Sequence, residues 1–561
     1  MSQTGPVVRG GLGRRLGHRL GHRLGRRLAG PSPEEALGAG TDRRILLLAR
    51  PDQAEAVASW REHLAADRVT VVTEATDLPR VVRRLGTLDA VVCLTDRLEG
   101  EGGRSCSLPD LVRRTYRSLR NSGRFLVDRR HATGDASDLV DWLDSLTEGA
   151  ATRGERDLAE SLPAYDVERA YVAVTKRGRH LLALREAEVV DLLPAREPDV
   201  SVRILAEQQA GELVSDSVVH SHGEHSSEFP TRYAYPRLTL RHYEGPVVAR
   251  GRTLMYAGNT VLPDSFRFHL SSTVRHPFLD NVGDRWTRLR PGRLPEPLPG
   301  SYYQLESTFA HHFGHVMAEV VSRLWGWDAA KRAVPDLKVL VHRGLVDPPE
   351  VTLEERVFEA YGISPDDIVK VDEPVLLESV VSATPMWHQH EPYYVHPGML
   401  DTYERLARGF TGGDPDGGEP HERVFVSRGE GAENRRCRNQ PEVEEWFADR
   451  GFEIVYPERH SLGEQVHLFR KAKVVAGFGG SGMFNVVHSR ALEKLIVLNH
   501  EAYIARNEHM FCSLLGADEH YFWSAPDVTH PDGRYSDEAF KASWAFDFAR
   551  NGDELEKAVG G

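Results

Sequence analysis

The stretch 423–485 constrains the fold most, because strand and helix patterns alternate through it without a break. Short apolar runs typical of buried strands lie at 424–426, 452–455 and 473–476. Between them are two segments with helical spacing. One runs from Pro441 to Arg450, and Ser461 can cap the other through a capping box with Glu464. Strands that alternate with helices of this length pair in parallel, so the sequence predicts an α/β half-domain.

Polar residues gather where two of these strands end. Ser427 and Arg428 follow the first strand, and the glycine-rich run 477–482 follows the third. Ligands of parallel sheets bind outside the carboxyl ends of the strands, so both features are expected at the same edge. Glycines let backbone N–H groups approach an anion, and a helix beginning near Ser481 adds a positive dipole end. The pattern favours a diphosphate, and a plain strand-to-helix turn is the alternative.

A second polar cluster lies in the segment 309–327, which the sequence predicts to be a helix. His311, His315 and Glu319 stand four residues apart and would share one helix face. An imidazole and a carboxylate placed in this way can divide the work of general-base catalysis, one taking a proton and the other orienting it. A structural polar helix start and a zinc site are the alternatives, although the His-Glu-x-x-His pattern of zinc enzymes is absent.

Length and charge limit the class of protein. The chain has 561 residues, enough for several domains, and a net charge of −13, which disfavours nucleic acid as a general partner. Its four cysteines lack metal-ligand spacing and no signal peptide precedes them, which indicates reduced thiols in the cytoplasm. No apolar run approaches the roughly 18 residues that cross a bilayer, so any membrane contact is expected to be peripheral.

Residues 1–40 read as a basic low-complexity tail and a linker. In the segment 9–28, leucines recur at every fourth position among arginines, without an acidic residue. A helix with this pattern would carry an apolar stripe flanked by arginines, which is typical of helices that lie on a membrane surface, here the inner face. Glycines in the same segment weaken a helix, so a disordered basic tail is the alternative.

Two further regions precede the second polar cluster. Residues 41–164 show the strand and helix cadence of methyltransferase-like Rossmann domains, but the loop Ala49–Gln53 after the first strand has no glycine. A structural or docking role is therefore expected. Residues 165–300 carry short β-type runs and form a β-rich connecting region. The histidines of this region, His220, His222 and His225, match no metal spacing and are predicted to lie in a solvated loop.

Residues 301–410 read as another α/β half, with strands at 339–341, 369–371 and 380–383 and a helix at 353–361. Aromatic and imidazole residues cluster between Trp387 and His396, where they would either stack on a sugar or pack between domains. The Asp-x-Asp pattern at 414–416, known from metal-dependent glycosyl transfer, lies in a flexible loop and is attributed to chance.

From about residue 250 to 523 the chain resembles the family 61 glycosyltransferases, which transfer sugars from nucleotide-sugar donors with inversion. The likeness rests on the family's His-x-x-x-(Asp/Glu) helix at 315–319, its strand-Ser-Arg motif at 424–428, the residues Arg436, Asn439 and Glu442, the segment 451–466 and the glycine turn at 472–485. Two positions depart from the family pattern. Gly479 stands where histidine is frequent, and Gln440 where glutamate is frequent.

The resemblance implies a GT-B architecture, in which two Rossmann-like domains face each other and the C-terminal one holds the donor. Glu319 or His315 would then be the base, with His311 beside them. No metal would be needed if arginines and a helix end neutralise the leaving diphosphate. The donor-binding residues would be Arg428, Arg436, Asn439, Glu442, Gly480, Ser481, Gly482 and Asn485.

We therefore predict an α/β protein with a GT-B-type pair of Rossmann-like domains, an additional N-terminal Rossmann-like domain and a β-rich connecting segment. The domains are 1–40, 41–164, 165–300, an acceptor-side domain at 301–410, a nucleotide-sugar-binding domain at 411–530 and a C-terminal tail at 531–561. The predicted reaction transfers a hexose or pentose from a nucleotide-diphosphate sugar, without any cofactor, to a glycan of a bacterial cell envelope or surface polysaccharide. Methyl transfer by the N-terminal domain and a non-catalytic sugar-binding scaffold are the alternatives, and a homo-oligomer is left open.

Overall fold

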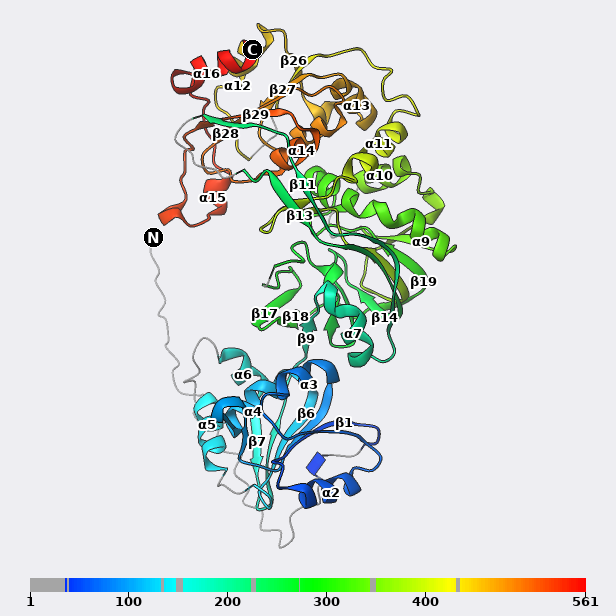
Figure 1. The fold of residues 1–561 in the computed structure, drawn as a ribbon, viewed down its shortest axis with the longest axis vertical. Coiled ribbons are helices and arrows are strands. Elements are labelled where there is room, and N and C mark those ends of the chain that lie inside the picture. Colours follow the sequence, from blue (N-terminus) through cyan, green and yellow to red (C-terminus); the bar gives the residue numbers. More distant parts are fainter. Residues whose placement is uncertain are drawn as a thin grey trace, which may run out of the picture. The chain divides into compact units, whose positions relative to one another are not determined.

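The structure is a computed structural model of the chain and has a mixed α/β fold (Figure 1). It describes residues 36–37, 40–132, 136–147, 155–222, 229–271, 273–343, 350–429 and 434–560. Two compact units are formed by Met1–Val82 with Thr87–Gly178, and by Arg83–Gly86 with Arg179–Gly561. None of the helices in these described ranges is long and apolar enough to span a membrane. The proposed membrane-contact segment 9–28 lies outside the described residues.

The first unit is built on a sheet with the strand order β2-β1-β3-β6-β8-β7. Its parallel strands are β1 (Arg44–Leu48), β2 (Arg68–Val72), β3 (Leu88–Cys93) and β6 (Leu119–Asp128). The helices that follow the strands are α2 (Ala54–His63), α3 (Leu78–Leu85), α4 (Leu108–Thr115), α5 (Ser137–Thr147) and α6 (Arg156–Ser161). The strand and helix cadence predicted for this region is therefore confirmed.

The antiparallel pair β7 (Ala164–Val167) and β8 (Tyr171–Thr175) completes this sheet beside β6. The sequence placed this pair at the start of the β-rich connecting region. The residues of β8 from Tyr171 to Val174 are all buried, and β8 lies inside the sheet, between β6 and the edge strand β7. A small hairpin of β4 (Arg97–Glu99) and β5 (Ser105–Ser107) precedes α4.

The second unit contains a large mixed sheet. Its parallel part has the order β22-β19-β20-β21, formed by β19 (Glu296–Gln304), β20 (Lys338–His342), β21 (Ile368–Val371) and β22 (Val375–Ala383). Helix α10 (Leu353–Tyr361) begins with a capping box from Thr352 and ends at Gly362, whose φ is +97°. The predicted strands and helix of this half are confirmed.

On the other side, strands extend the mixed sheet through antiparallel pairings, except for β16 (Thr260–Val261) and β9 (His180–Ala183), which are parallel. Two of the short β-type runs expected in the connecting region are joined in one long strand, β14 (Leu238–Ala249), with an irregular register between Glu244 and Val247. The remaining strands are β10 (Ser201–Gln208), β15 (Met255–Ala257), β17 (Leu279–Gly283) and β18 (Trp286–Leu289), with helix α7 (Glu186–Arg196) packed near β10.

The C-terminal sheet is parallel throughout, with the order β12-β29-β28-β27-β25-β26. Its strands are β25 (Arg423–Val426), β26 (Glu453–Val455), β27 (Val474–Phe478), β28 (Lys494–His500) and β29 (Asp518–Ser524), with β12 (Val219–His222) at the edge. The helices are α12 (Gln440–Ala448), α13 (Leu462–Arg470), the 3₁₀ helix η8 (Ser481–His488), α14 (Asn507–Leu515), α15 (Asp537–Phe540) and α16 (Phe548–Gly560). The predicted parallel half-domain and the capping box of Ser461 are confirmed.

Successive side chains of these strands point to opposite faces of the sheet. Phe425, Ile496 and Phe522 pack with α12 and α16 on one face. Val424, Leu495 and Tyr521 pack on the other face, in a cluster that contains residues of α13, η8 and α14 and continues into the mixed sheet. The two α/β halves of this unit thus share one apolar core, and α11 (Met399–Phe410) connects them along the chain.

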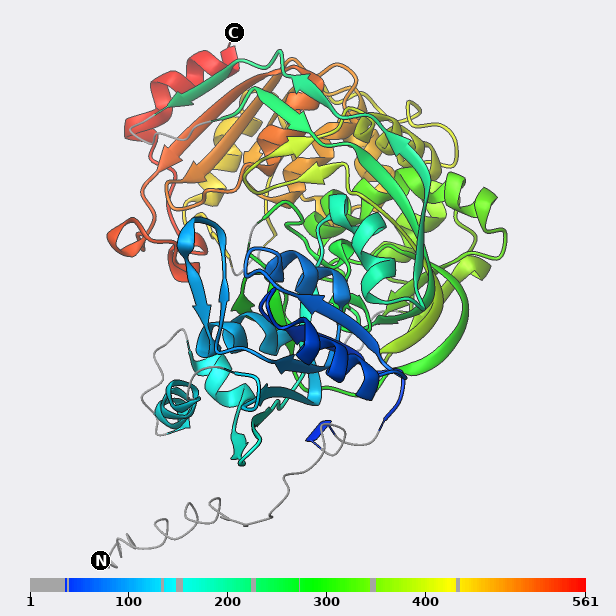
Figure 2. The ribbon, with the colours of Figure 1, turned by 60° about the horizontal axis from the view of Figure 1, so that its bottom comes forward.

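The segments 201–222 and 229–249 run between the mixed sheet and the far edge of the parallel sheet, where β12 lies beside β29 (Figures 1 and 2). The pair β11 (Gly211–Val214) and β13 (Arg232–Tyr235) lies on this path. His220 and His222 are therefore in a strand, and the prediction of a solvated loop was wrong for them. Their strand pairs with β29, about 300 residues away in the chain, which local sequence patterns do not reveal. His225 lies outside the described residues.

Candidate functional site

The centre of the candidate site is an imidazole–carboxylate pair at the start of a helical segment. The segment comprises α8 (Phe313–His315), a π-helical turn Val316–Val320, a 3₁₀ stretch Val321–Gly326 and α9 (Trp327–Ala333). His315 and Glu319 are one helical turn apart, and Nδ1 of His315 lies 2.7 Å from Oε1 of Glu319. π-helical turns inside helices frequently mark functional sites.

Glu319 is held by four side chains. Oε1 accepts hydrogen bonds from Nε of Arg267 at 2.5 Å and from Nε2 of Gln389 at 3.2 Å, in addition to the contact with His315. Oε2 accepts one from Oγ of Ser307 at 2.8 Å. The carboxylate is buried, with 9% of its side chain exposed, so these contacts fix both oxygens.

The environment keeps Glu319 ionised. Burial alone would raise the pKa of this carboxyl, but the hydrogen bond from His315 and the charge of Arg267 lower the pKa to about 2. A carboxylate with such a pKa is a poor proton acceptor near neutrality. It can instead hold the imidazole of His315 in one orientation through Nδ1. Among the described residues, none hydrogen-bonds to Nε2 of His315 in this structure.

Aromatic rings surround His315. The ring of Phe309 stacks on the imidazole, with 4.5 Å between ring centroids and 27° between planes. The ring of His312 meets it edge-on at 4.8 Å. The guanidinium of Arg267 also lies over the ring of Phe309, 5.5 Å from its centroid, but Phe309 is 48% exposed, so part of its apolar surface is open next to the imidazole. Such a surface is suited to stacking on the apolar face of a sugar ring.

His311 lies apart from this pair, and the prediction that it shares a helix face with His315 and Glu319 was wrong. The helix begins at Phe313, and His311 precedes it with a left-handed φ of +62°. Its Nδ1 lies 2.9 Å from Oε2 of Glu354, and its backbone N–H donates to Oε1 of the same carboxylate at 2.6 Å. Glu354 thus holds His311 outside the helix, so His311 does not continue the row formed by His315 and Glu319.

The glycine turn after β27 is the second part of the site. Gly480 has a φ of +152° and precedes the 3₁₀ helix η8. A Cβ atom on Gly480 would lie 3.3 Å from Nη2 of Arg435 and 3.8 Å from Nη1 of Arg428. The two guanidinium groups therefore flank the turn. The first N–H groups of a helix have no acceptor within that helix, so Ser481 and Gly482 add donors at the same place.

Neither arginine is paired with a carboxylate among the described residues at the distance of a salt bridge. Burial and the neighbouring charge of Arg435 lower the pKa of the Arg428 guanidinium to about 10. The guanidinium of Arg435 lies over the ring of Tyr503, 4.3 Å from its centroid. Two half-buried cations held side by side favour an anionic ligand, because an anion would relieve their mutual repulsion.

A buried carboxyl lies below the glycine turn. Oε1 of Glu508, in the first turn of α14, accepts a hydrogen bond from the backbone N–H of Gly480 at 2.5 Å. Burial raises the pKa of Glu508 to about 7, although this hydrogen bond and Arg435 oppose the rise. The sequence patterns gave no sign of this residue, because it stands in an otherwise ordinary helix start.

The two parts of the site touch each other. Gly314, the residue before His315, packs against Ser481, the residue after Gly480, so that a Cβ on Gly314 would lie 2.8 Å from Cβ of Ser481. The imidazole and the glycine turn are therefore neighbours across the contact between the two α/β halves.

Among the other residues predicted to bind the donor, Asn439, Glu442 and Asn485 have structural partners. Nδ2 of Asn439 donates to Oε2 of Glu442 and to the carbonyl of Phe546, both at 3.0 Å. Asn485 is buried and donates to Oε1 of Gln465 at 2.9 Å. Arg436 is exposed, while the adjacent Arg435 turns to the glycine turn.

Both departures from the family pattern have a local explanation. Nε2 of Gln440 donates to the carbonyl of Arg428 at 2.8 Å and to Oε1 of Glu444 at 2.7 Å, so it fixes the end of β25. The side chain of Asn499 occupies the space that a side chain at Gly479 would need.

Two other predicted clusters serve packing. The ring of Trp387 packs against Phe511 of the C-terminal half, with 4.5 Å between ring centroids and 32° between planes, which favours the packing alternative for the cluster 387–396. In the 414–416 loop, Oδ1 of Asp416 accepts a hydrogen bond from Nε of Arg470 at 2.7 Å.

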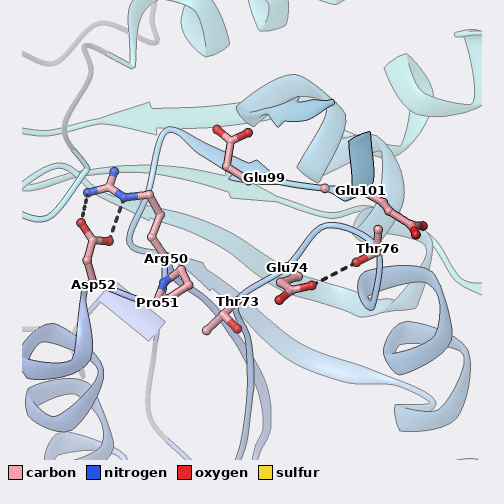
Figure 3. Close-up of a pocket in the computed structure, with 9 residues that line it drawn as sticks. Arg50, Pro51, Asp52, Thr73, Glu74, Thr76, Glu99 and Glu101 are labelled. Carbon is pink, nitrogen blue, oxygen red and sulfur yellow. Dashed lines mark hydrogen bonds and ion pairs between the residues drawn. The ribbon is translucent and has the colours of Figure 1, made fainter. Parts of the chain in front are cut away.

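The first unit has a separate pocket of about 860 Å³ at the carboxyl ends of β1 and β2 (Figure 3). The guanidinium of Arg50 is turned to Asp52, with Nε 3.0 Å from Oδ1. The other charged residues that line the pocket are the carboxylates of Glu74, Glu99 and Glu101. This excess of negative charge disfavours a phosphate-bearing ligand.

A comparison with known protein families gives a match within the second unit. Residues 313–496 match a family model. The family is Glycosyltransferase 61. The match begins at the helix that carries His315 and Glu319 and extends through the glycine turn, so the Glycosyltransferase 61 region contains both parts of the candidate site. No curated protein matches the chain.

Among solved structures, the MycE methyltransferase of the mycinamycin biosynthetic pathway is 13% identical, with 24% of this chain and 42% of that chain covered and a TM-score of 0.19. Phosphoethanolamine N-methyltransferase 2 of Haemonchus contortus is 9% identical, with 94% and 76% covered and a TM-score of 0.14. The chain spans less than half the length of MycE. At these TM-scores no common fold is established, and the methyltransferase-like character of the first unit stays a prediction.

Proposed function

We propose that the protein is an inverting glycosyltransferase that moves a sugar from a nucleotide-diphosphate sugar to a hydroxyl group of a glycan. The family match of residues 313–496 supports the reaction class. The proposal treats the two α/β halves of the second unit as a GT-B-type pair, with the acceptor on the side of the mixed sheet and the donor on the side of the parallel sheet. Ligands of parallel sheets bind outside the carboxyl ends of the strands, where Arg428 and Gly480 lie.

In this proposal the donor diphosphate binds at the glycine turn. Arg428 and Arg435 would contact its oxygens, and the N–H groups of Ser481 and Gly482 would add hydrogen bonds. The negative charge on the diphosphate grows as the bond to the sugar breaks, so groups that are already in place stabilise the transition state more than the ground state. The two cations supply the charge that a metal ion provides in other transferases.

His315 is the base in this proposal, and Glu319 is a positioning residue. Nε2 of His315 takes the proton of the acceptor hydroxyl while the hydroxyl oxygen forms the new bond to the anomeric carbon. The bond from that carbon to the diphosphate breaks in the same step, and the diphosphate leaves with the bonding electrons. Because the oxygen attacks opposite the leaving group, the configuration at the carbon inverts. Glu319 stabilises the imidazolium that forms through Nδ1.

The observation that carries the proposal is the contact of Gly314 with Ser481, because it joins the base and the diphosphate site. A panel of UDP-, GDP- and CDP-sugars tests it, with release of the nucleoside diphosphate as the readout. Turnover of at least one donor is expected. Arg428→Ala should weaken nucleotide binding by tenfold or more and leave the melting temperature nearly unchanged. Absence of turnover with every donor, together with unaltered nucleotide affinity in Arg428→Ala, would overturn the proposal.

The biological setting that we propose is the synthesis of a bacterial cell-envelope or surface polysaccharide. The support is the resemblance to the family and the basic, leucine-rich segment 9–28, whose composition suits an anionic membrane surface. On this basis the protein acts in the cytoplasm, at the inner face of the membrane, with the segment 9–28 as its contact. Binding of the full chain to anionic vesicles, compared with a chain lacking residues 1–40, tests this setting.

A further inference from the structure

A second cavity lies next to the imidazole. It has a volume of about 570 Å³ and is lined by residues of the mixed-sheet half, among them Phe309 and His312, whose rings both contact His315. Thr308 lines this cavity and also a smaller one that Glu319 lines. A molecule in the cavity would therefore reach the surroundings of the proposed base.

The carboxylates of this cavity are already matched by partners. Glu306 accepts hydrogen bonds from the backbone N–H of His342 at 2.9 Å and of Thr253 at 3.2 Å, and its Oε1 lies 2.5 Å from Nδ1 of His342. Glu354 is engaged by His311. The other two carboxylates form ion pairs, Asp372 with Arg343 and Glu373 with Arg293.

Two cations of the cavity have no such match. Arg250 and Arg252 line the cavity, and neither is ion-paired with a carboxylate among the described residues at the distance of a salt bridge. Both guanidinium groups lie over the ring of Phe278, at 4.9 and 5.9 Å from its centroid. The cavity therefore has a cationic end, formed by Arg250, Arg252 and Phe278.

Arg250 is held in a fixed orientation. Its Nη1 donates to the carbonyl of Arg290 at 2.8 Å, and its Nη2 donates to the carbonyl of Pro291 at 3.0 Å. A guanidinium has five N–H donors, so these two bonds leave further donors for a ligand. Arg252 is exposed and has a left-handed φ of +49°. One fixed and one exposed guanidinium next to an aromatic ring form a suitable site for a ring that carries an anionic group.

We infer that this cavity binds an acidic sugar of the acceptor glycan, with its carboxylate, sulfate or phosphate between Arg250 and Arg252. The inference rests on the proposed function, since it names the acceptor class of the same site. The exposed ring of Phe309 would stack on the sugar nearer to His315, and Phe278 would lie beside the acidic one. The donor diphosphate has its own cationic site at Arg428 and Arg435, so these arginines are free for the acceptor.

A glycan array tests the inference with the full chain. The array carries neutral oligosaccharides and oligosaccharides with uronic acids, sulfates or phosphates, and its acidic members distinguish the three anionic groups. We expect binding to be confined to acidic glycans. For the best of them, Arg252→Ala should weaken the affinity about tenfold and Arg252→Glu should abolish binding. Arg332→Ala is the matched control, because Arg332 is also exposed and lies on α9, outside the cavity lining.

Binding to neutral glycans, binding to no glycan, or equal affinities of Arg252→Ala and Arg332→Ala would each overturn the inference. Melting curves of the three variants show whether a loss of binding results from unfolding. The panel of nucleotide sugars shows whether the inference or the proposed function has failed. Turnover of a nucleotide sugar with array binding confined to neutral glycans would overturn the inference alone. Arg252-dependent binding of acidic glycans without turnover of any donor would overturn the proposed function and retain the acidic-glycan site.

Discussion

Gly314 lies directly against Ser481, and no side chain fits between them. A Cβ atom on Gly314 would be 2.8 Å from Cβ of Ser481 and 3.2 Å from Cε2 of Phe484. His315 follows Gly314, and Gly480 precedes Ser481, so this contact brings the imidazole next to the glycine turn. The mixed-sheet half and the parallel-sheet half thus meet at the two segments that carry the proposed chemistry.

Gly314→Ala is expected to impair both stability and turnover. The added methyl group must push the helix of His315 away from η8, and overpacking of this kind costs about 1–3 kcal/mol of unfolding free energy. A small shift between the base and the donor should lower kcat further. Thermal unfolding and donor turnover measure the two effects. Gly552→Ala is the control, because a Cβ on Gly552 in α16 meets no atom within 4 Å. If both variants match the unaltered protein, the contact is not required.

Arg435→Ala should weaken binding of UDP or GDP by about tenfold or more, the loss expected for one charge-assisted hydrogen bond. Arg436→Ala should leave the affinity unchanged, because Arg436 is exposed and Arg435 flanks Gly480. The two substitutions remove the same charge from adjacent positions. A difference in nucleotide affinity between them, measured by titration calorimetry, therefore reflects the position of the side chain alone. A larger loss in Arg436→Ala than in Arg435→Ala would contradict the arrangement at the glycine turn.

The same pair of residues shows what the sequence could predict and what it could not. Alternating strands and helices fixed the parallel half-domain, since apolar periodicity and capping residues are local signals. They also placed Arg428 and the glycine turn at one sheet edge. The side-chain direction within a loop is set by tertiary contacts, such as the ring of Tyr503 under Arg435. Local sequence patterns therefore could not predict which of Arg435 and Arg436 faces the glycine turn.

The imidazole–carboxylate pair illustrates the same limit. The four-residue spacing of His315 and Glu319 predicted their contact, which is local. Extending the spacing to His311 failed, because the helix begins later and Glu354 attracts that imidazole. The partner Arg267 comes from a segment 52 residues away in the chain, so periodicity gave no sign of it. The pairing of the short strand β12 with β29 was missed for the same reason.

His315→Ala should lower kcat by about 10²–10⁴, the range expected for loss of a general base, with nucleotide affinity unchanged. Imidazole added to the assay should restore part of the turnover, because the substitution leaves space where the ring was. A merely structural role of His315 would show no such rescue. Turnover with the nucleotide-sugar panel and calorimetric titration of the diphosphate are the measurements. Normal turnover in His315→Ala would move the base role to another residue.

Glu319→Gln should lower both turnover and stability. The amide keeps the shape of the carboxyl but leaves Arg267 without its anionic partner, and breaking a buried ion pair typically costs about 3–5 kcal/mol. The charge of Glu319 also stabilises the fold in a pH-dependent way. Because the folded-state pKa is lowered from 4.5 to about 2, its contribution is complete above pH 4.5 and is lost as the pH falls through about 2. The stability of Glu319→Gln should not show this loss between pH 4.5 and about 2. Acid unfolding curves that are the same for Glu319→Gln and the unaltered protein would contradict the prediction.

Glu508→Gln is expected to change how nucleotide binding depends on pH. Glu508 accepts the N–H of Gly480, which is one of the donors beside the proposed diphosphate site. As the pH rises through about 7, the carboxyl becomes ionised and its negative charge competes with the diphosphate for Arg435 and the turn. The affinity of the unaltered protein for UDP should therefore fall several-fold from mildly acidic to mildly alkaline pH, whereas Glu508→Gln should bind equally well across the range.

The same substitution should alter stability in the same pH range. The folded-state pKa of Glu508 is raised from 4.5 to about 7, so the unaltered protein loses stability as the pH rises from 4.5 through about 7, and the loss is complete above that range. From this shift the loss is roughly 3 kcal/mol. Glu508→Gln cannot ionise and should be the more stable protein at alkaline pH. Glu493→Gln serves as control, since Glu493 is exposed and is not among the residues proposed to bind the donor, and it should preserve both pH profiles of the unaltered protein. Parallel profiles for Glu508→Gln and the unaltered protein would show that this carboxyl does not act on the glycine turn.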